Sequence, residues 1–261
     1  MIPPGYAQVR AGLLLRVGDE AAAVALLGAA PDAGRAATEG GRGTARAHRL
    51  PDGRVAWVRS YRHGGWFGRL LGGWYFGWPS RPERELRATE AARAAGIAAP
   101  EILAAETVRW GPFYRGRLVS RDVAGHRSLR AALQATTGGA EREAWLAAIV
   151  RDVVRLHQGG VHHPDLNSTN LLVAAGPDEA IAFLDFDRGR VFSRAVSGRW
   201  RRLAHRRLVR SLAKLDLPGL SASVLANLLE PVKTGGSVLS LGKPVARDGD
   251  PSPAVVRKRR E

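Results

Sequence analysis

The sequence contains no cysteine, and this absence excludes two kinds of stabilisation. A chain without thiols can form neither a disulfide framework nor a thiolate metal site. The composition therefore fits a reducing compartment, and any metal ion must be held by other ligands.

Long hydrophobic runs are also missing from the sequence. No window approaches the roughly 20 apolar residues that span a bilayer. The start, MIPPGYAQVRAGLLLRV, has no cationic leader before a long apolar run. We therefore expect a protein that is cytoplasmic or peripheral to a membrane.

Lysine is scarce, and arginine is the only strong cation through residue 213. All four lysines lie in the last fifth of the chain: Lys214, Lys233, Lys243 and Lys258. Any phosphate clamp before them must therefore use guanidinium groups. Lysine and arginine together number 40 against 24 acidic residues, and the resulting net charge of +16 predicts a polyanionic partner. Nucleic acid, an anionic membrane and a phosphorylated substrate all satisfy this condition.

The apolar pattern predicts an α+β protein. The 261 residues, 45% of them hydrophobic, suffice for one bilobal domain or two small ones. Strands and helix 81–95 are expected in the first part, with a strand pair around Pro51–Gly53. Helices dominate later, and the longest, 141–157, has four large apolar residues on one face: Trp145, Ile149, Val153 and Leu156.

We expect four segments along the chain. They are an N-terminal segment (1–34), a sheet-rich nucleotide-binding N-lobe (35–120), a helical catalytic C-lobe (121–230) and a tail (231–261). The tail is rich in Gly, Pro and Ser and ends in a basic cluster, which predicts disorder.

Polar residues suited to phosphoryl transfer flank one predicted β-hairpin. The stretch LHQGGVHHPDLNSTNLLV, residues 156–173, presents Asp165, Asn167 and Asn170 just before a strand. A loop and a returning antiparallel strand bring Asp185 back beside Asn170. Carboxylate and amide oxygens such as those of Asn170 and Asp185 suit Mg2+, and Asp165, offset from this pair, can accept a hydroxyl proton. The spacing therefore predicts phosphoryl transfer.

Two motifs carry a resemblance to kinases. HPDLNSTN, residues 163–170, resembles the catalytic loop H-x-D-L-x-x-x-N, and DFD, residues 185–187, resembles the metal-binding D-F-G. More narrowly, GGVHHPDLNSTNLLV followed by FLDFDRGRV is similar to the lipopolysaccharide core kinases that phosphorylate 3-deoxy-D-manno-octulosonic acid (Kdo) on Kdo-lipid A. GRGTA, VRSYRHGG and GIAAPEILAAE match as well, so the resemblance runs from about residue 35 to about residue 215.

The resemblance implies a bilobal protein-kinase-like fold and a phosphotransferase with an alcohol acceptor. The cofactors would be ATP and Mg2+, and the acceptor would be the 4-hydroxyl of Kdo on Kdo-lipid A. The protein would lie peripherally at the cytoplasmic face of the inner membrane, with the anionic membrane surface as a partner. No nucleic acid is expected to bind, and no protein partner is inferred.

The resemblance also assigns roles to individual residues. Asp165 matches the catalytic aspartate, and Asn170 and Asp185 match the metal ligands. Arg59 stands where kinases usually have a phosphate-binding lysine, and Glu85 matches the helix glutamate that pairs with this cation. Alternatives remain for both positions: Arg62 for the cation, and Glu83 or Glu90 for the glutamate. The other nucleotide-binding residues are Asn167 and, in the loop over the phosphates, Gly41, Gly43 and Thr44.

The departures from the kinase pattern are informative. Pro164 replaces an arginine that reads a phosphorylated activation loop in many protein kinases, and no A-P-E motif follows Asp187. We therefore expect no regulation by loop phosphorylation. Asp187 replaces the glycine of D-F-G, so an in/out movement of this segment should be restricted, because only glycine adopts positive φ freely. His163 is expected to be a structural, hydrogen-bonding residue.

Aromatic and basic residues gather in two places. Residues 62–81 hold six aromatic residues among arginines and glycines, which suits either a membrane interface or packing between the lobes. The helix after Trp200 has leucines on one side and arginines largely on another. These arginines form a solvated face or bind the phosphates and carboxylate of Kdo-lipid A.

Two other functions remain open. A kinase of the same fold that acts on a core heptose or an aminoglycoside-like molecule would differ only in its acceptor pocket. A non-catalytic nucleic-acid-binding protein would exploit the charge of +16, and its binding would weaken steeply with salt.

Overall fold

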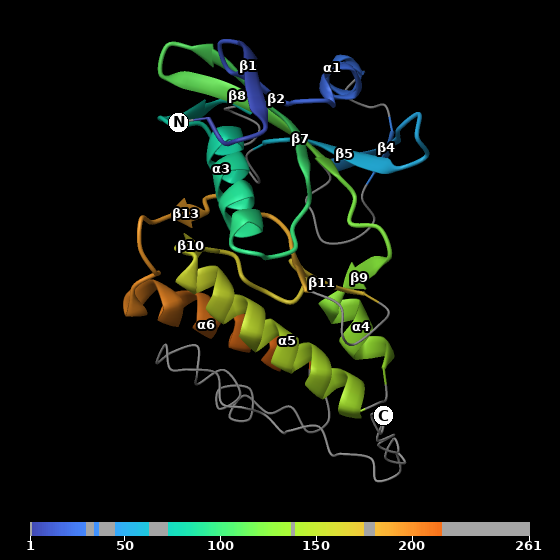
Figure 1. Cartoon of the computed structure of the whole chain (residues 1–261), viewed down its shortest axis with the longest axis vertical. Helices are drawn as coiled ribbons and strands as arrows, with labels where there is room; N and C mark the ends of the chain where they lie inside the picture. The colour runs from blue at the N-terminus through green and yellow to red at the C-terminus, as the bar shows by residue number, and fades with distance from the viewer. Residues whose placement is uncertain are drawn as a thin grey trace, which may run out of the picture.

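The computed structural model describes residues 2–29, 34–36, 45–62, 73–136, 139–174 and 181–215. The predicted tail (231–261), the turn 41–44 and residues 63–72 of the aromatic stretch lie outside these residues. In the described part the chain is mixed α/β. A twisted sheet lies at one end of the molecule, and helices α4, α5 and α6 lie at the other (Figure 1).

The main sheet is antiparallel and has eight strands within the described residues. Their order is β1-β2-β7-β8-β5-β4-β3, and β6 pairs with β8. The segment 1–34 therefore supplies strands of this sheet, because β2 pairs with β7. The strands are β1 Tyr6–Arg10, β2 Leu13–Arg16, β3 Arg35–Ala36, β4 Ala45–Arg49, β5 Val55–Ser60, β6 Tyr75–Phe76, β7 Ile102–Trp110 and β8 Phe113–Arg121.

Helix α3, Arg81–Ala94, packs against β7 and β8, and its own sequence fixes both of its ends. Ser80 is the N-cap of a capping box, and Pro82 occupies the first turn, where its missing N–H costs no hydrogen bond. Gly96, with φ 76°, follows the end of the helix. The boundaries that Pro82 and Gly96 predict are thus confirmed.

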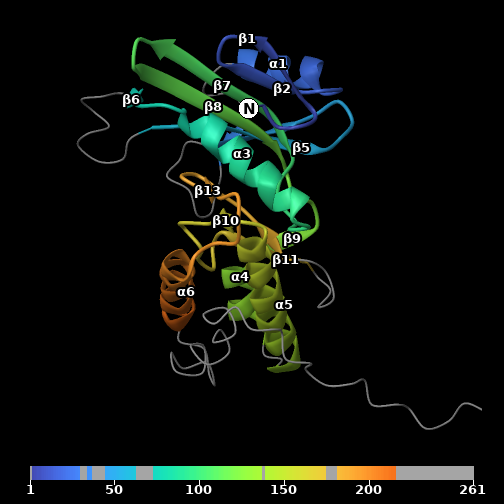
Figure 2. The ribbon, with the colours of Figure 1, turned by 60° about the vertical axis from the view of Figure 1, so that its left-hand side comes forward.

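The helical part holds the remaining functional segments. Helix α5 runs beside α4 and α6, and a short sheet, β12-β11-β9, lies between α5 and the main sheet (Figures 1 and 2). A two-stranded pair, β10-β13, contacts α3. The elements are α1 Glu20–Gly28, packed on the main sheet, then β9 His126–Ser128, α4 Leu129–Ala135, α5 Gly139–Gln158, β10 Val161–His162, β11 Leu171–Ala174, β12 Ala182–Phe183, β13 Arg190–Val191 and α6 Gly198–Ala213.

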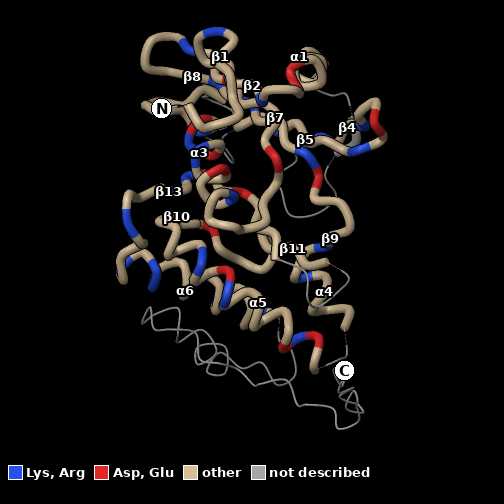
Figure 3. The backbone as a smooth tube through the Cα atoms, viewed as in Figure 1, with Lys and Arg blue, Asp and Glu red and all other residues tan. Residues whose placement is uncertain are grey.

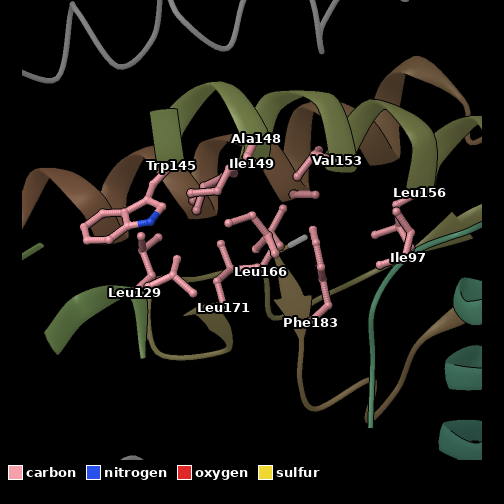
Figure 4. Close-up of a cluster of buried hydrophobic side chains, with 14 of the residues drawn as sticks. Ile97, Leu129, Trp145, Ala148, Ile149, Val153, Leu156, Leu166, Leu171 and Phe183 are labelled. Atoms are coloured by element: carbon pink, nitrogen blue, oxygen red, sulfur yellow. The ribbon is translucent and has the colours of Figure 1, made fainter. Parts of the chain in front are cut away.

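The apolar face of α5 forms the centre of the larger core. The four residues that the helical spacing places on one face are all buried, as predicted, and they meet side chains from the segments that follow α5 (Figure 4). Each large apolar side chain buried there contributes about 1.5–3 kcal/mol. Leu166, fully buried in this core, fixes the chain directly after Asp165.

The predicted β-hairpin is present, but its second strand is short. Strands β11 and β12 pair antiparallel, as expected. The sequence predicts a returning strand over AIAFLDF, residues 180–186, whereas β12 covers only Ala182–Phe183. The extended conformation ends because Asp185 has φ 60°, in the left-handed region. This change of direction turns the Asp185 side chain out of the hairpin.

Candidate active site

The loop Asp165–Asn170 joins β10 to β11 and is braced by its own side chains. The Asn167 amide nitrogen donates to Asp165 Oδ1 at 2.9 Å. The Asn167 Oδ1 accepts from the backbone N–H groups of Thr169 and Asn170, at 2.9 and 3.1 Å. Asparagine is suited to such turns because its short amide mimics a backbone peptide. Asn167 therefore holds the shape of the loop.

The two candidate ligands of a divalent cation lie at neighbouring backbone positions. Asn170 Nδ2 donates to the carbonyl of Asp165 at 2.9 Å. The carbonyl of Asn170 accepts from the N–H of Leu184 at 2.8 Å, which brings Asp185 alongside Asn170, as the hairpin predicts. Because the amide nitrogen is committed to the loop, Asn170 presents Oδ1 as its remaining ligand atom.

His163 links the loop to the segment that carries Asp185. Its Nε2 lies 2.7 Å from the carbonyl oxygen of Leu184, and its Nδ1 accepts from the N–H of Asp165 at 3.2 Å. The ring packs on the buried Phe186 with centroids 4.8 Å apart. Burial lowers the pKa of His163, so the neutral ring donates through Nε2 and accepts through Nδ1. The predicted structural role of His163 is confirmed.

Arg59, on β5, contacts two acidic residues at once. Its Nη1 donates to Asp185 Oδ1 at 2.8 Å, and its Nη2 forms an ion pair with Glu85 on α3. Burial alone would raise the pKa of Asp185, but the charge and hydrogen bond of Arg59 outweigh it and hold this pKa below its usual value. The fork of a guanidinium group makes both contacts possible, since its nitrogens point in different directions.

Glu85 is the glutamate that meets this cation. It is buried, and Tyr61 also donates its hydroxyl to the carboxylate. Burial raises the pKa of Glu85 to about 7, against the opposing effect of the Arg59 charge. The two alternatives face elsewhere: Glu83 closes the capping box at Ser80, and Glu90 accepts from Tyr6 at 2.9 Å.

The other candidate cation, Arg62, is exposed. Within the described part of the chain it makes no ion pair with Glu85 or Asp185. Arg59 is therefore the better match for the nucleotide-binding cation. Gly41, Gly43 and Thr44 lie outside the described residues.

The sequence patterns did not predict two ion pairs of the site. Arg81, at the start of α3, forms a two-pronged ion pair with Asp187, with Nε donating to Oδ1 at 2.9 Å. Arg207, on α6, lies 2.5 Å from Asp165 Oδ1. Asp187 in place of glycine was a signal that this position has a partner. Nothing in the helical spacing singles out Arg207 from the other arginines of α6.

The donor set fits a nucleotide-bound Mg2+ ion. Asn170 and Asp185 offer oxygen atoms, which Mg2+ prefers, and a site of this kind takes its remaining ligands from phosphates and water. Both contacts of the Asp165 carboxylate fall on Oδ1, and its Oδ2 has no hydrogen-bond partner among the described residues. This oxygen is thus available to accept a proton.

Comparisons with known proteins agree on one family. The model of the "Lipopolysaccharide kinase (Kdo/WaaP) family" matches residues 31–227. A "3-deoxy-D-manno-octulosonic acid kinase" of Vibrio vulnificus (strain YJ016) is 34% identical over 177 residues, which cover 67% of this chain and 71% of the relative. A protein of the same name from Xylella fastidiosa (strain 9a5c) is 35% identical over 185 residues, covering 69% and 70%.

A solved structure shows the same fold. The chain is similar to a structure described as "WaaP in complex with acyl carrier protein", with a TM-score of 0.56 and 19% sequence identity. The match covers 77% of this chain and 78% of that one.

Proposed function

Because the chain belongs to the lipopolysaccharide kinase (Kdo/WaaP) family and is therefore a phosphotransferase, we propose that it transfers the γ-phosphate of ATP to the 4-hydroxyl of Kdo on Kdo-lipid A. The arrangement of Asp165, Asn170 and Asp185 around one loop and one hairpin carries this proposal. A non-catalytic role for the positive charge no longer competes, since the family is one of kinases.

Asp165 acts as the proton acceptor in this proposal. Its Oδ2 takes the proton of the acceptor hydroxyl while the hydroxyl oxygen forms a bond to the γ-phosphorus. The bond from that phosphorus to the β-bridging oxygen breaks, and ADP leaves. Asn167 and Arg207 hold Oδ1, at 2.9 and 2.5 Å, so the carboxylate keeps one orientation through the step.

Asn170 and Asp185 would hold Mg2+, whose charge would offset that of the phosphates. Arg59 would bind the phosphates of ATP, with Glu85 fixing its position from α3. Asn167 lies in the same loop and braces it, which supports an indirect contribution to nucleotide binding.

A bilobal, protein-kinase-like arrangement is part of the proposal. Residues 35–120 would form the nucleotide-binding lobe and 121–230 the catalytic lobe. The supporting observation is that Arg59 and Glu85 come from the sheet and α3, whereas Asp165 and Asn170 come from the helical part.

The chain would lie peripherally on the cytoplasmic face of the inner membrane. None of the helices in the described part of the chain is long and apolar enough to cross a membrane. An aromatic edge, made of Phe76, Trp78, Trp110 and Phe113, is exposed where β6 meets the ends of β7 and β8 (Figure 2). Arg109 stacks over Trp78 at 3.3 Å. Aromatic rings interleaved with guanidinium groups suit an anionic lipid interface.

The proposal is tested by incubating the protein with ATP, Mg2+ and Kdo-lipid A and measuring the product by mass spectrometry. We expect one added phosphate, placed on the 4-hydroxyl by NMR. Asp165→Asn should lower turnover by about 100- to 10,000-fold with little change in ATP affinity. Asp52→Asn, the same change at an exposed turn, should leave turnover unaltered.

The acceptor is the part of the proposal most open to contradiction. No added phosphate on Kdo-lipid A, with phosphate added to a heptosylated core acceptor or to an aminoglycoside-like molecule, would replace Kdo by that acceptor. Full turnover in Asp165→Asn would remove Asp165 from the chemistry.

A further inference from the structure

A basic cavity lies directly beside the loop that carries Asp165. Its volume is about 670 Å³. Four cationic side chains line it, together with polar groups of the loop, and no acidic residue is among the described residues that line it. The cations are Arg130, Arg207, Arg210 and Lys214.

The fold brings these cations together from two helices. Arg207 and Arg210 lie on α6 and Lys214 is its C-cap; they are three, four and seven positions apart, so they share one face over a length of about 10 Å. Figure 3 shows basic positions along α6. Arg130 belongs to the first turn of α4, and its backbone N–H donates to the carbonyl of Ser168 at 3.1 Å. The cavity is therefore bordered by α4, α6 and the candidate catalytic loop, and it is open to solvent on one side.

The position of α6 against this loop is fixed by hydrogen bonds. Ser211 lies on the same face of α6 as the cations, and its hydroxyl accepts from the N–H of Ser168 at 3.0 Å. The two serine hydroxyls are also 2.9 Å apart. Because Ser168 is buried, this contact sets how α6 meets the loop, and hence where the basic face of α6 lies relative to Asp165.

Most of the charge in the cavity is uncompensated. Arg207 is paired with Asp165. In the part of the chain that the structure describes, the side chains of Arg130, Arg210 and Lys214 make no ion pair or hydrogen bond. Like charges gathered in one concave site repel one another and lower stability, unless an anion occupies the site. Such a cluster is therefore explained by ligand binding better than by stability.

We propose that this cavity binds an oxyanion of the acceptor, a carboxylate or a phosphate on the same molecule as the reacting hydroxyl. The inference rests on the proposed function, because it places the acceptor at Asp165. Arg207 touches both the cavity and Asp165 Oδ1, so an anion held there lies next to the proton acceptor. The cavity would thus hold the anionic group of the acceptor, and an acceptor without such a group would bind weakly.

The test compares two charge-neutralised pairs on the same helix. Arg210→Gln with Lys214→Gln removes two cations of the cavity, neither of which touches Asp165. Arg202→Gln with Arg206→Gln removes two exposed charges of α6 that are not among the lining residues. We expect the first pair to raise the KM for Kdo-lipid A by about tenfold or more and to leave the KM for ATP unchanged, and the second pair to change neither.

Two modified acceptors distinguish the source of the oxyanion. One is Kdo-lipid A with its Kdo carboxylate methylated, and the other lacks the lipid A phosphates. Removing the group that occupies the cavity should lower the affinity of the wild type for the acceptor. The same removal should not lower the affinity of the Arg210→Gln, Lys214→Gln pair any further, because this pair no longer binds that group.

A binding measurement decides the inference without relying on turnover. Calorimetric titration of the wild-type protein with free Kdo and, separately, with inorganic phosphate should show binding that the cavity pair loses and the control pair keeps. Equal binding by both pairs, or none by the wild type, would overturn the cavity proposal even if Kdo-lipid A is phosphorylated. Absence of phosphate transfer, with anion binding lost only in the cavity pair, would instead reject the proposed function.

Discussion

Asp185, a candidate metal ligand, has an unfavourable backbone conformation. Its φ of 60° is rare for a residue with a Cβ and costs about 1–2 kcal/mol. The surroundings supply what holds it there: Phe186 is buried against His163, and Arg59 binds the carboxylate. Strain that is held in place by neighbouring contacts is typical of functional sites.

Glu85 should make the folded state less stable as pH rises, the reverse of the usual effect of a carboxyl group. Its folded-state pKa of about 7 lies above the ordinary value of 4.5, so the folded chain binds this proton more readily than the unfolded chain does. A raised carboxyl pKa therefore lowers the free energy of unfolding as pH rises from 4.5 towards 7. Between pH 5 and pH 8 this contribution amounts to about 2–3 kcal/mol.

Glu85→Gln isolates this contribution, because glutamine resembles the protonated carboxyl. Urea unfolding of both proteins at pH 5 and pH 8 should show the wild type losing about 2–3 kcal/mol relative to Glu85→Gln on going to the higher pH. The other titrating groups cancel in this difference. A difference that stays constant, or one that grows in favour of the wild type at pH 8, would mean that Arg59 compensates the burial of the carboxylate in full.

The elements that carry the site meet at a few close backbone approaches, and one of these lies at Gly160, shortly before the catalytic loop. It has φ 77° at the end of α5. A Cβ there would overlap the carbonyl oxygen of Phe192 and lie 2.9 Å from that of Arg194. Glycine at this position therefore lets the segment before α6 cross directly over the start of β10.

Gly125 offers a matched control for this position. Its φ is 76°, and a Cβ added there would meet nothing within 4 Å. Gly125→Ala should lower the free energy of unfolding by about 1 kcal/mol from backbone strain alone. Gly160→Ala should lower it by about 3 kcal/mol, because overpacking adds to the same strain. Equal losses in chemical denaturation would show that the segment shifts away at little cost.

Periodicity predicts elements well where one side of the element is buried. The apolar spacing of α5 and the Pro82 and Gly96 signals of α3 give both helices to within a few residues. The sequence predicts a strand over Pro100–Ala104, whereas β7 extends six residues further, to Trp110. The reason is that the apolar run breaks at Glu106 and Thr107, which are buried, while Val108 and Trp110 are exposed, so no buried apolar face marks this part of the strand.

In the candidate site, too, contacts between residues close in the sequence can be predicted, whereas contacts between distant segments cannot. The convergence of Asn170 and Asp185 follows from one short hairpin, and its pairing register is a local property of the chain. The contacts of Arg207 with Asp165 and of Arg81 with Asp187 join segments far apart in the sequence. Their partners depend on how α6 and α3 pack, which no spacing within either helix encodes.

At the scale of the molecule, two ion pairs join the sheet-bearing part to the segment Asp185–Asp187. Arg59 reaches Asp185 from β5, and Arg81 reaches Asp187 from α3. Arg81 also stacks over the rings of Tyr61 and Tyr75, at 5.0 and 4.8 Å. Moving this segment would break both pairs in a partly buried setting, which supports the prediction that its movement is restricted.

The aromatic edge and the net charge of +16 together predict association with anionic lipid. Phe76 and Trp110 are 74% and 73% exposed, while Tyr75, next to Phe76 on β6, is buried, so the described residues of β6 both pack and face outward. Burying exposed rings in a lipid interface is favourable, and arginines add attraction that salt weakens.

Sedimentation with vesicles tests this association. The wild type should bind phosphatidylcholine vesicles that contain phosphatidylglycerol, bind poorly without it, and be released by high salt. Phe76→Ser with Trp110→Ser should weaken binding by at least about tenfold. Val17→Ser with Val24→Ser, which removes exposed apolar side chains elsewhere, should leave it intact. If both pairs bind equally, charge alone holds the protein at the membrane, and the aromatic edge must serve another contact.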